Sequence, residues 1–145
     1  MAKSFSATVD AWVLKSRARM LAVFQEGTKR MVSIAQSRIP VDTGFARASI
    51  RASLTEMPQV MSSSDKGRTI GANYLYDPGP IILTIANAKL GQPIYIGWTA
   101  NYVGYLETGH SQQAPSGFIR VTALMWPQII KEVIAEAKAR ASRTP

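Results

Sequence analysis

The chain has 145 residues, no cysteine, a single histidine and a net charge of +8. This length suits one domain with a real hydrophobic core, and the absence of cysteine excludes disulfides and thiolate metal sites. Because His110 alone cannot build a histidine cluster, we expect no metal and no cofactor. No apolar stretch approaches the roughly 20 residues of a membrane span, and residues 1–12 lack a signal-peptide core, which favours a soluble protein made in the cytoplasm.

The positive charge is concentrated at the two ends of the sequence. Residues 1–51 hold nine Lys and Arg against three acids, residues 52–119 hold three against four, and residues 120–145 hold five against two, which gives +6, −1 and +3. A surplus of this size favours contact with phosphate or with acidic protein surfaces, without deciding between the two.

Residues 4–38 are predicted to form a long amphipathic helix. Apolar side chains recur at steps of three, four or seven, the spacing of one helical face. They are Phe5, Val9, Trp12, Val13, Met20, Val23, Phe24, Met31 and Ile34. Gly27 costs about 1 kcal/mol relative to alanine and is a point where the helix can bend. Pro40 ends the helix, because the residue before a proline is steered away from helical dihedrals.

Residues 40–44, Pro-Val-Asp-Thr-Gly, admit two interpretations. Asp-Thr-Gly after an apolar residue is how an aspartic protease presents its catalytic carboxylate, and residues 94–97 could imitate the apolar-apolar-Gly element of that family. That enzyme needs a second carboxylate, here from a symmetric dimer, and a body made mostly of strands. We favour a turn in which Asp42 accepts backbone N–H groups, Thr43 is a second acceptor and Gly44 is left-handed. We therefore predict no catalytic residue.

Residues 46–100 are predicted to supply a small antiparallel sheet of three to four strands. Residues 46–57 alternate loosely enough to be a strand after one helical turn. Residues 81–88 and 93–99 are expected to pair as a hairpin. Residues 57–80 mix Ser, Gly, Pro and Asp without a period, which indicates a long loop or arm.

The end of the chain is predicted to be helical. Residues 102–109 form a short helix or a strand end, and residues 115–141 form a C-terminal helix. Pro127 must interrupt or kink this helix, because a proline inside a helix removes a backbone donor. The order of long helix, small antiparallel sheet and helix predicts a single α+β domain over residues 1–145.

Other residues that could bear chemistry are assigned to ordinary structure. Glu107, His110 and Ser111 superficially offer an orienter, a base and a nucleophile, but side chains so close in sequence rarely point at one another productively. The glycines near them do not have the spacing of a phosphate-binding loop. Aromatic residues between 74 and 105 could stack on bases, but we expect most of them to be core or subunit contacts.

Two blocks of the sequence match the pattern of one family. Residues 39–50, IPVDTGFARASI, follow Pro-x-Asp-Thr-Gly-x-Leu-x-x-Ser, and residues 101–124 follow Tyr-Ala-x-Tyr-x-Glu-x-Gly-Thr and then Pro-Phe-Leu-Arg-Pro-Ala. The matching residues are Pro40, Asp42, Thr43, Gly44 and Ser49, then Tyr102, Tyr105, Glu107, Gly109, Phe118, Ile119, Arg120 and Ala123. Phe45 and Ala46 stand where the leucine region of the family falls, His110 replaces the usual threonine, Val121 replaces a proline, and Ser116-Gly117 separates the proline from the aromatic residue. With these departures, the chain resembles the tail-completion (head-tail joining, or neck) proteins of long-tailed bacteriophages.

The resemblance implies a non-enzymatic virion protein that is assembled in the host cytoplasm. Such proteins form a ring, of six or twelve copies, that joins the DNA-filled head to the tail. Its implied partners are adjacent neck, portal-adaptor and tail-tube or terminator proteins, with genomic DNA held non-specifically in the channel. A stopper or tail-terminator ring protein and a small basic DNA-binding protein remain alternatives.

The long helix is expected to supply the ring contacts. About 30 helical residues span about 45 Å, as much as or more than the width of a compact domain, so part of the apolar stripe overhangs. Each large apolar side chain left in water forfeits roughly 1.5 to 3 kcal/mol, which favours cover from a neighbouring copy. The predicted contact residues are Phe5, Trp12, Met20, Phe24 and Met31. The predicted DNA-channel residues are Arg17, Arg19, Lys29, Arg30, Lys66 and Arg68.

Overall fold

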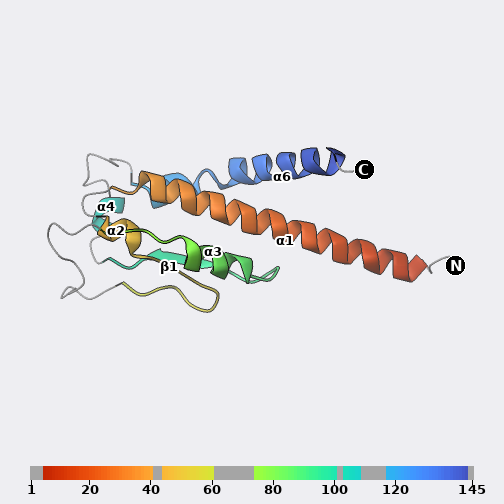
Figure 1. The fold of residues 1–145 in the computed structure, drawn as a ribbon, viewed down its shortest axis with the longest axis horizontal. Coiled ribbons are helices and arrows are strands. Elements are labelled where there is room, and N and C mark those ends of the chain that lie inside the picture. Colours follow the sequence, from red (N-terminus) through yellow and green to blue (C-terminus); the bar gives the residue numbers. More distant parts are fainter. Residues whose placement is uncertain (1–4, 41–43, 61–73, 101–102, 109–116, 144–145) are drawn as a thin grey trace.

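The computed structural model describes residues 5–40, 44–60, 74–100, 103–108 and 117–143. Its elements are α1 (Phe5–Arg38), α2 (Phe45–Ala48), β1 (Ile50–Ser53), α3 (Gly79–Ala86), β2 (Tyr95–Trp98), α4 (Val103–Glu107), α5 (Ile119–Ala123) and α6 (Trp126–Arg143). Helix α6 lies along one side of α1, and the sheet with α3 lies on the other (Figure 1). The predicted α+β class is therefore confirmed in its general form, with α1 as the central element.

Helix α1 is one helix of 34 residues, about 50 Å long, as the apolar spacing predicts. It runs without interruption through Gly27, where a bend was expected. A Cβ atom at Gly27 would lie 2.6 Å from Ile130 Cδ1 and 3.2 Å from Trp126 Cη2. The missing side chain therefore lets α6 pack closely against α1, and this contact compensates for the low helix propensity of glycine.

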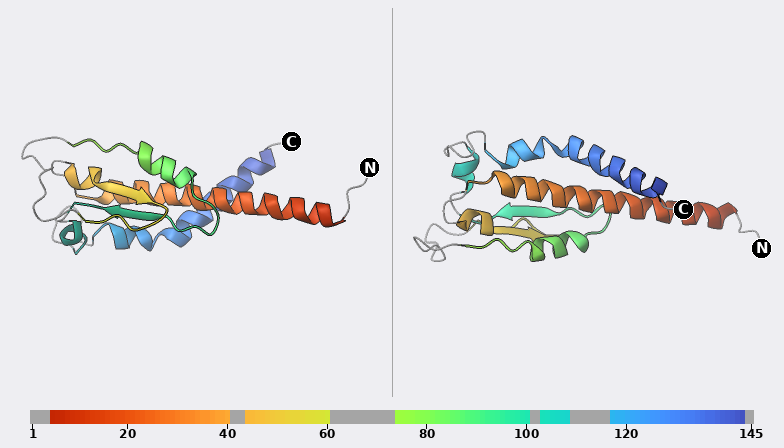
Figure 2. Two further views of the ribbon diagram at one scale, coloured as in Figure 1. Left: turned by 90° about the horizontal axis from the view of Figure 1, so that it is seen from below. Right: turned by 45° about the horizontal axis from the view of Figure 1, so that its top comes forward.

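The hydrophobic core surrounds only the C-terminal half of α1. The buried residues of this helix are Gly27, Thr28, Val32, Ala35 and Gln36. One cluster joins Ala35 and Ile39 to Phe45, Ala46, Ala100, Val103 and Phe118, and a second joins Val32 to Ile50, Ile81 and Ile85. The N-terminal end of α1 instead projects past the end of α6 and beyond the sheet (Figures 1 and 2).

The sheet has two antiparallel strands in the part of the chain that the structure describes, not the three to four predicted. Ile50 of β1 lies opposite Trp98 of β2, and Ser53 lies opposite Tyr95. Residues 95–98 thus form the predicted strand, but with β1 as partner. The segment expected to form a strand over residues 46–57 begins with the helical turn α2 and continues as β1 over four residues.

The predicted strand and hairpin at residues 81–88 are wrong, because this segment forms helix α3. Asp77 Oδ1 accepts the Gly79 N–H at 3.0 Å, and a proline occupies the first turn, where its missing N–H costs nothing. Ile81 and Ile85 are buried, whereas Leu83 between them is 63 % exposed. Burial therefore repeats every four residues, as on a helix, and not every two.

The predicted C-terminal helix at residues 115–141 is divided in two. Helix α5 ends at Ala123 and α6 begins at Trp126, so Pro127 stands in the first turn of α6, the position that tolerates a proline. The predicted interruption is thus confirmed. Residues 103–107 form the short helix α4, one of the two forms expected there. None of the described helices is apolar enough over a sufficient length to cross a membrane.

Candidate functional site

The first sequence block forms a buried joint between α1 and the sheet. Pro40 is buried, and Gly44 has φ of 83°, the left-handed conformation expected of it. A Cβ atom at Gly44 would lie 2.5 Å from the carbonyl oxygen of Tyr74, and the ring of Phe45 packs edge-on against that of Tyr74 at 5.0 Å. Asp42 and Thr43 lie outside the described residues, so their predicted capping role stays a prediction.

Ser49 closes this joint from the other side. Its hydroxyl donates to the Ala46 carbonyl at 2.6 Å, which ties down the end of α2. The Ser49 carbonyl accepts the Thr99 N–H at 3.1 Å and the Thr99 hydroxyl at 2.8 Å. Ser49 thus connects the end of α2 to residue 99, which follows β2, through hydrogen bonds to backbone groups.

Gln36 is a buried polar residue of α1 that the sequence analysis did not single out. Its Oε1 accepts the Trp98 Nε1–H at 2.7 Å, and its Nε2 donates to the Arg47 carbonyl at 2.9 Å. Burial raises the pKa of the Tyr76 hydroxyl, and a hydrogen bond with Gln36 opposes that shift. Gln36 therefore joins α1 to α2 and β2, and its amide is satisfied where it is only 2 % exposed.

The second sequence block is organised around Glu107. Its Oε2 accepts the backbone N–H groups of Phe118 and Ile119 at 2.9 and 2.7 Å, and its Oε1 accepts that of Arg120 at 2.8 Å. These N–H groups belong to the first turn of α5, and the backbone N–H groups of a first turn have no acceptor within their own helix. Gly117, with φ of 80°, brings the chain close enough that a Cβ atom would lie 2.4 Å from the Glu107 carbonyl oxygen. Glu107 therefore caps α5 from a distant helix.

The block also anchors the core. Phe118 is 0 % exposed and packs edge-on against Trp98 with ring centroids 5.2 Å apart. The Arg120 side chain is exposed, so its described contribution is its backbone N–H. Tyr102 and Gly109 lie outside the described residues, as does the side chain of Tyr105. The members of this block that the structure brings together thus perform a structural task.

Replacing Glu107 with glutamine is expected to lower the free energy of unfolding at neutral pH by about 1 to 2 kcal/mol, the size of a lost helix cap. Burial of the carboxyl raises its pKa, but the three backbone hydrogen bonds outweigh burial and leave the pKa below its ordinary value of 4.5. A lowered pKa stabilises the fold above the ordinary value, and that stability is lost as the pH falls through the folded pKa.

The measurement is urea unfolding of both proteins between pH 7 and pH 3. The difference between them should stay constant at and above about pH 6 and shrink steadily below the ordinary carboxyl pKa. Glu56→Gln is the matched control, because Glu56 is exposed in the segment after β1, and it should leave the free energy of unfolding at pH 7 nearly unchanged. A constant gap down to pH 3 would contradict the capping role.

An apolar stripe is exposed on the projecting half of α1. No described side chain from residue 6 to residue 20 is buried, and Trp12 and Met20 are 69 % and 59 % exposed. Val9, 40 % exposed, shares their face, because spacings of three and eight residues repeat on a helix. We call Val9, Trp12 and Met20 the α1 stripe. The side chain of Phe5 lies outside the description.

Two of the predicted contact residues are partly covered within the chain itself. Phe24 packs edge-on against Trp126 of α6, with ring centroids 6.1 Å apart, and Met31 is half-buried. Phe24 and Met31 are thus partly covered within their own chain, and their role as subunit contacts stays a prediction. Both line a neutral groove of about 570 Å³ between α1, β2 and the start of α6. Its other lining residues are Thr28, Met57, Ile94, Tyr95, Ile96, Ala123 and Trp126, none of them charged.

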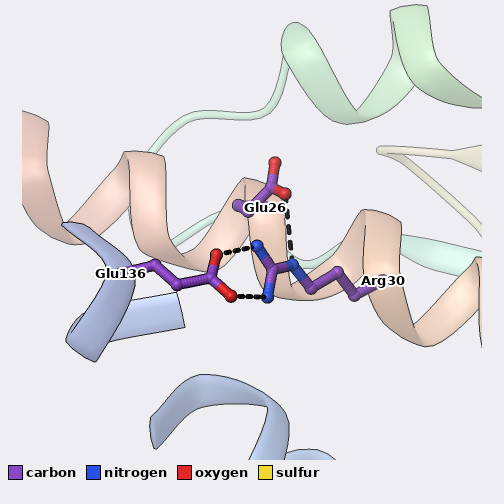
Figure 3. A network of polar contacts seen from close by, with 3 residues as sticks. All are labelled: Glu26, Arg30 and Glu136. Carbon is purple, nitrogen blue, oxygen red and sulfur yellow. Dashed lines mark hydrogen bonds and ion pairs between the residues drawn. The ribbon is translucent and has the colours of Figure 1, made fainter. Parts of the chain in front are cut away.

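The predicted DNA-channel residues do not form one described cluster. Arg17 and Arg19 are exposed on the N-terminal half of α1, and Lys29 is half-buried beside α6. Arg30 is bonded to two carboxylates, Glu26 at 3.2 Å on its own helix and Glu136 on α6 (Figure 3). Because these bonds occupy its guanidinium, Arg30 joins α1 to α6 and is not a free cation for phosphate. Lys66 and Arg68 lie outside the described residues.

The described parts of the chain contain no group of three or more His, Cys, Asp or Glu side chains that could hold a metal ion. Of residues 94–97, the supposed protease element, residues 95–97 lie in β2 and pair with β1. The described residues include two strands of four residues each, far fewer strand residues than the body of such an enzyme needs. His110 and Ser111 fall outside the description.

Comparison with known proteins yields no relative. No protein-family model, no curated protein and no solved structure matches the chain.

Proposed function

We propose that this protein is a structural component of the neck of a long-tailed bacteriophage, where it forms a homo-oligomeric ring that joins the DNA-filled head to the tail. The proposal rests on the resemblance of the two sequence blocks to tail-completion proteins. Its main physical support is the α1 stripe, an apolar surface that the described residues of its own chain leave largely exposed.

A ring needs two different surfaces on each copy, because a heterologous contact places one patch against another around the axis. The α1 stripe is a projecting apolar surface, and the neutral groove is a recessed one. Arg17 and Arg19 flank the stripe, and none of the described residues that line the groove carries a charge that would repel them. In our proposal the stripe of each copy therefore docks in the neutral groove of the next copy.

The test is electron microscopy of particles made without this protein. We expect filled heads and separate tails, and supplying the protein to such an extract should restore joined virions. Normal virions in its absence would reject the joining role. Tails of abnormal length without separated heads would instead indicate the tail-terminator alternative, since a terminator ends tube growth.

A further inference from the structure

A second groove lies between α1 and the C-terminal half of α6 and has a volume of about 620 Å³. Its apolar lining includes Val23 of α1 and Val133, Ile134 and Ala137 of α6. Val133 is 2 % exposed and forms the deep part, whereas Ile134 is 37 % exposed and is accessible to a ligand. We call this the α1–α6 groove.

The rim of the α1–α6 groove is basic. Arg19 and Lys29 border it on α1, and Lys138 and Arg140 border it on α6. Glu26 is the one acid among the lining residues, and its carboxylate is bonded to Arg30. The groove therefore offers a hydrophobic floor between two rows of positive charge.

We propose that the α1–α6 groove binds an acidic amphipathic helix of a partner protein. A third helix can lie along two packed helices, with its apolar residues on the floor and its carboxylates toward the rim. Apolar contact supplies the affinity, and complementary charge supplies the orientation and a fast association rate. This inference does not depend on the ring, because the neutral groove and the α1 stripe are separate surfaces.

The surface chemistry favours this occupant over duplex DNA and over a second copy. Phosphates would satisfy Lys138 and its basic neighbours but would leave the apolar floor in water. The α1 stripe of another copy would bring Arg17 and Arg19 beside the basic rim, where like charges repel. An acidic amphipathic helix would cover the apolar floor with its apolar side chains and place its carboxylates beside the basic rim.

The experiment measures fluorescence anisotropy of a labelled 16-residue peptide with leucines at i, i+4, i+7 and i+11 and glutamates elsewhere. Lys138→Glu should weaken binding by about tenfold at low salt, and Ile134→Ser by about fivefold. Lys89→Glu makes the same charge change on an exposed residue after α3 and should leave binding unchanged. Urea unfolding verifies that each variant is folded.

Two results of this experiment would overturn the proposal. In the first, the peptide does not bind; in the second, it binds the Lys138→Glu variant as tightly as the unchanged protein. If a 20-base-pair duplex binds, loses affinity in Lys138→Glu and is indifferent to Ile134→Ser, the groove is a DNA site. If sedimentation shows self-association that both groove variants abolish, its occupant is a second copy.

Discussion

Gly117→Ala is expected to lower the free energy of unfolding by at least about 3 kcal/mol. A left-handed alanine costs about 1 to 2 kcal/mol by itself. The new Cβ would also meet the Glu107 carbonyl oxygen at 2.4 Å, and this backbone atom cannot rotate away. Relief requires α4 to move away from α5, which weakens the cap on α5, worth about 1 kcal/mol or more, and loosens the buried ring of Phe118.

Gly91→Ala is the matched control for this measurement. Gly91 has φ of 85°, but apart from its chain neighbours no described atom lies within 4 Å of its would-be Cβ, so its substitution reports the cost of the conformation alone. Gly44→Ala should resemble Gly117→Ala, because its Cβ would lie 2.5 Å from the Tyr74 carbonyl oxygen. Urea titrations of the three variants give the differences. Equal losses at Gly91 and Gly117 would refute the close packing of α4 on α5.

The features predicted from sequence are those that local chemistry determines. The spacing of apolar residues in α1 predicts its length, Pro127 predicts the break before α6, and Gly44 predicts a left-handed turn. Each of these depends on the backbone preferences of a few neighbouring residues. Local preference was therefore sufficient to place the long helix and its joints.

Residues 81–85 show where local preference fails. Ile-Ile-Leu-Thr-Ile has strong strand propensity, yet Asp77 and the prolines around Gly79 start a helix, and packing of Ile81 and Ile85 on the second core cluster completes it. Strand propensity depends on context, because it measures how a side chain packs. The third strand of the predicted sheet depended on this segment, and the possible fourth on residues 102–109, where residues 103–107 form helix α4.

Contacts between distant residues were also beyond the sequence pattern. The Glu26–Arg30 pair has the four-residue spacing of a helical ion pair and was open to detection, but the bond from Arg30 to Glu136 spans 106 positions. The cap that Glu107 forms on α5 also could not be predicted from local sequence, because the carboxylate belongs to another helix and not to the residue next to α5. Only the folded chain brings such groups together.

Replacing Trp12 and Met20 together with glutamate is expected to abolish head-tail joining while leaving the fold intact. Both side chains are more than half exposed, so unfolding should change by no more than about 0.5 kcal/mol. In a ring, each copy would lose the burial of two large apolar groups, about 1.5 to 3 kcal/mol each. Self-association should weaken on the order of 100-fold or more, measured by sedimentation and by recovery of infectious particles in an extract lacking the protein.

The control is the double variant Ala11→Glu with Ala18→Glu, which adds the same charge to the opposite face of the same helix half. It should assemble normally, because only the face bearing Val9, Trp12 and Met20 enters the neutral groove.

Met57, 58 % exposed at that groove, allows a stricter test. A Met57→Glu copy keeps its stripe and a Trp12→Glu, Met20→Glu copy keeps its groove, so a mixture should form one-to-one pairs that neither forms alone. Rings formed by the stripe variant alone would show that the projecting helix end is not the subunit contact.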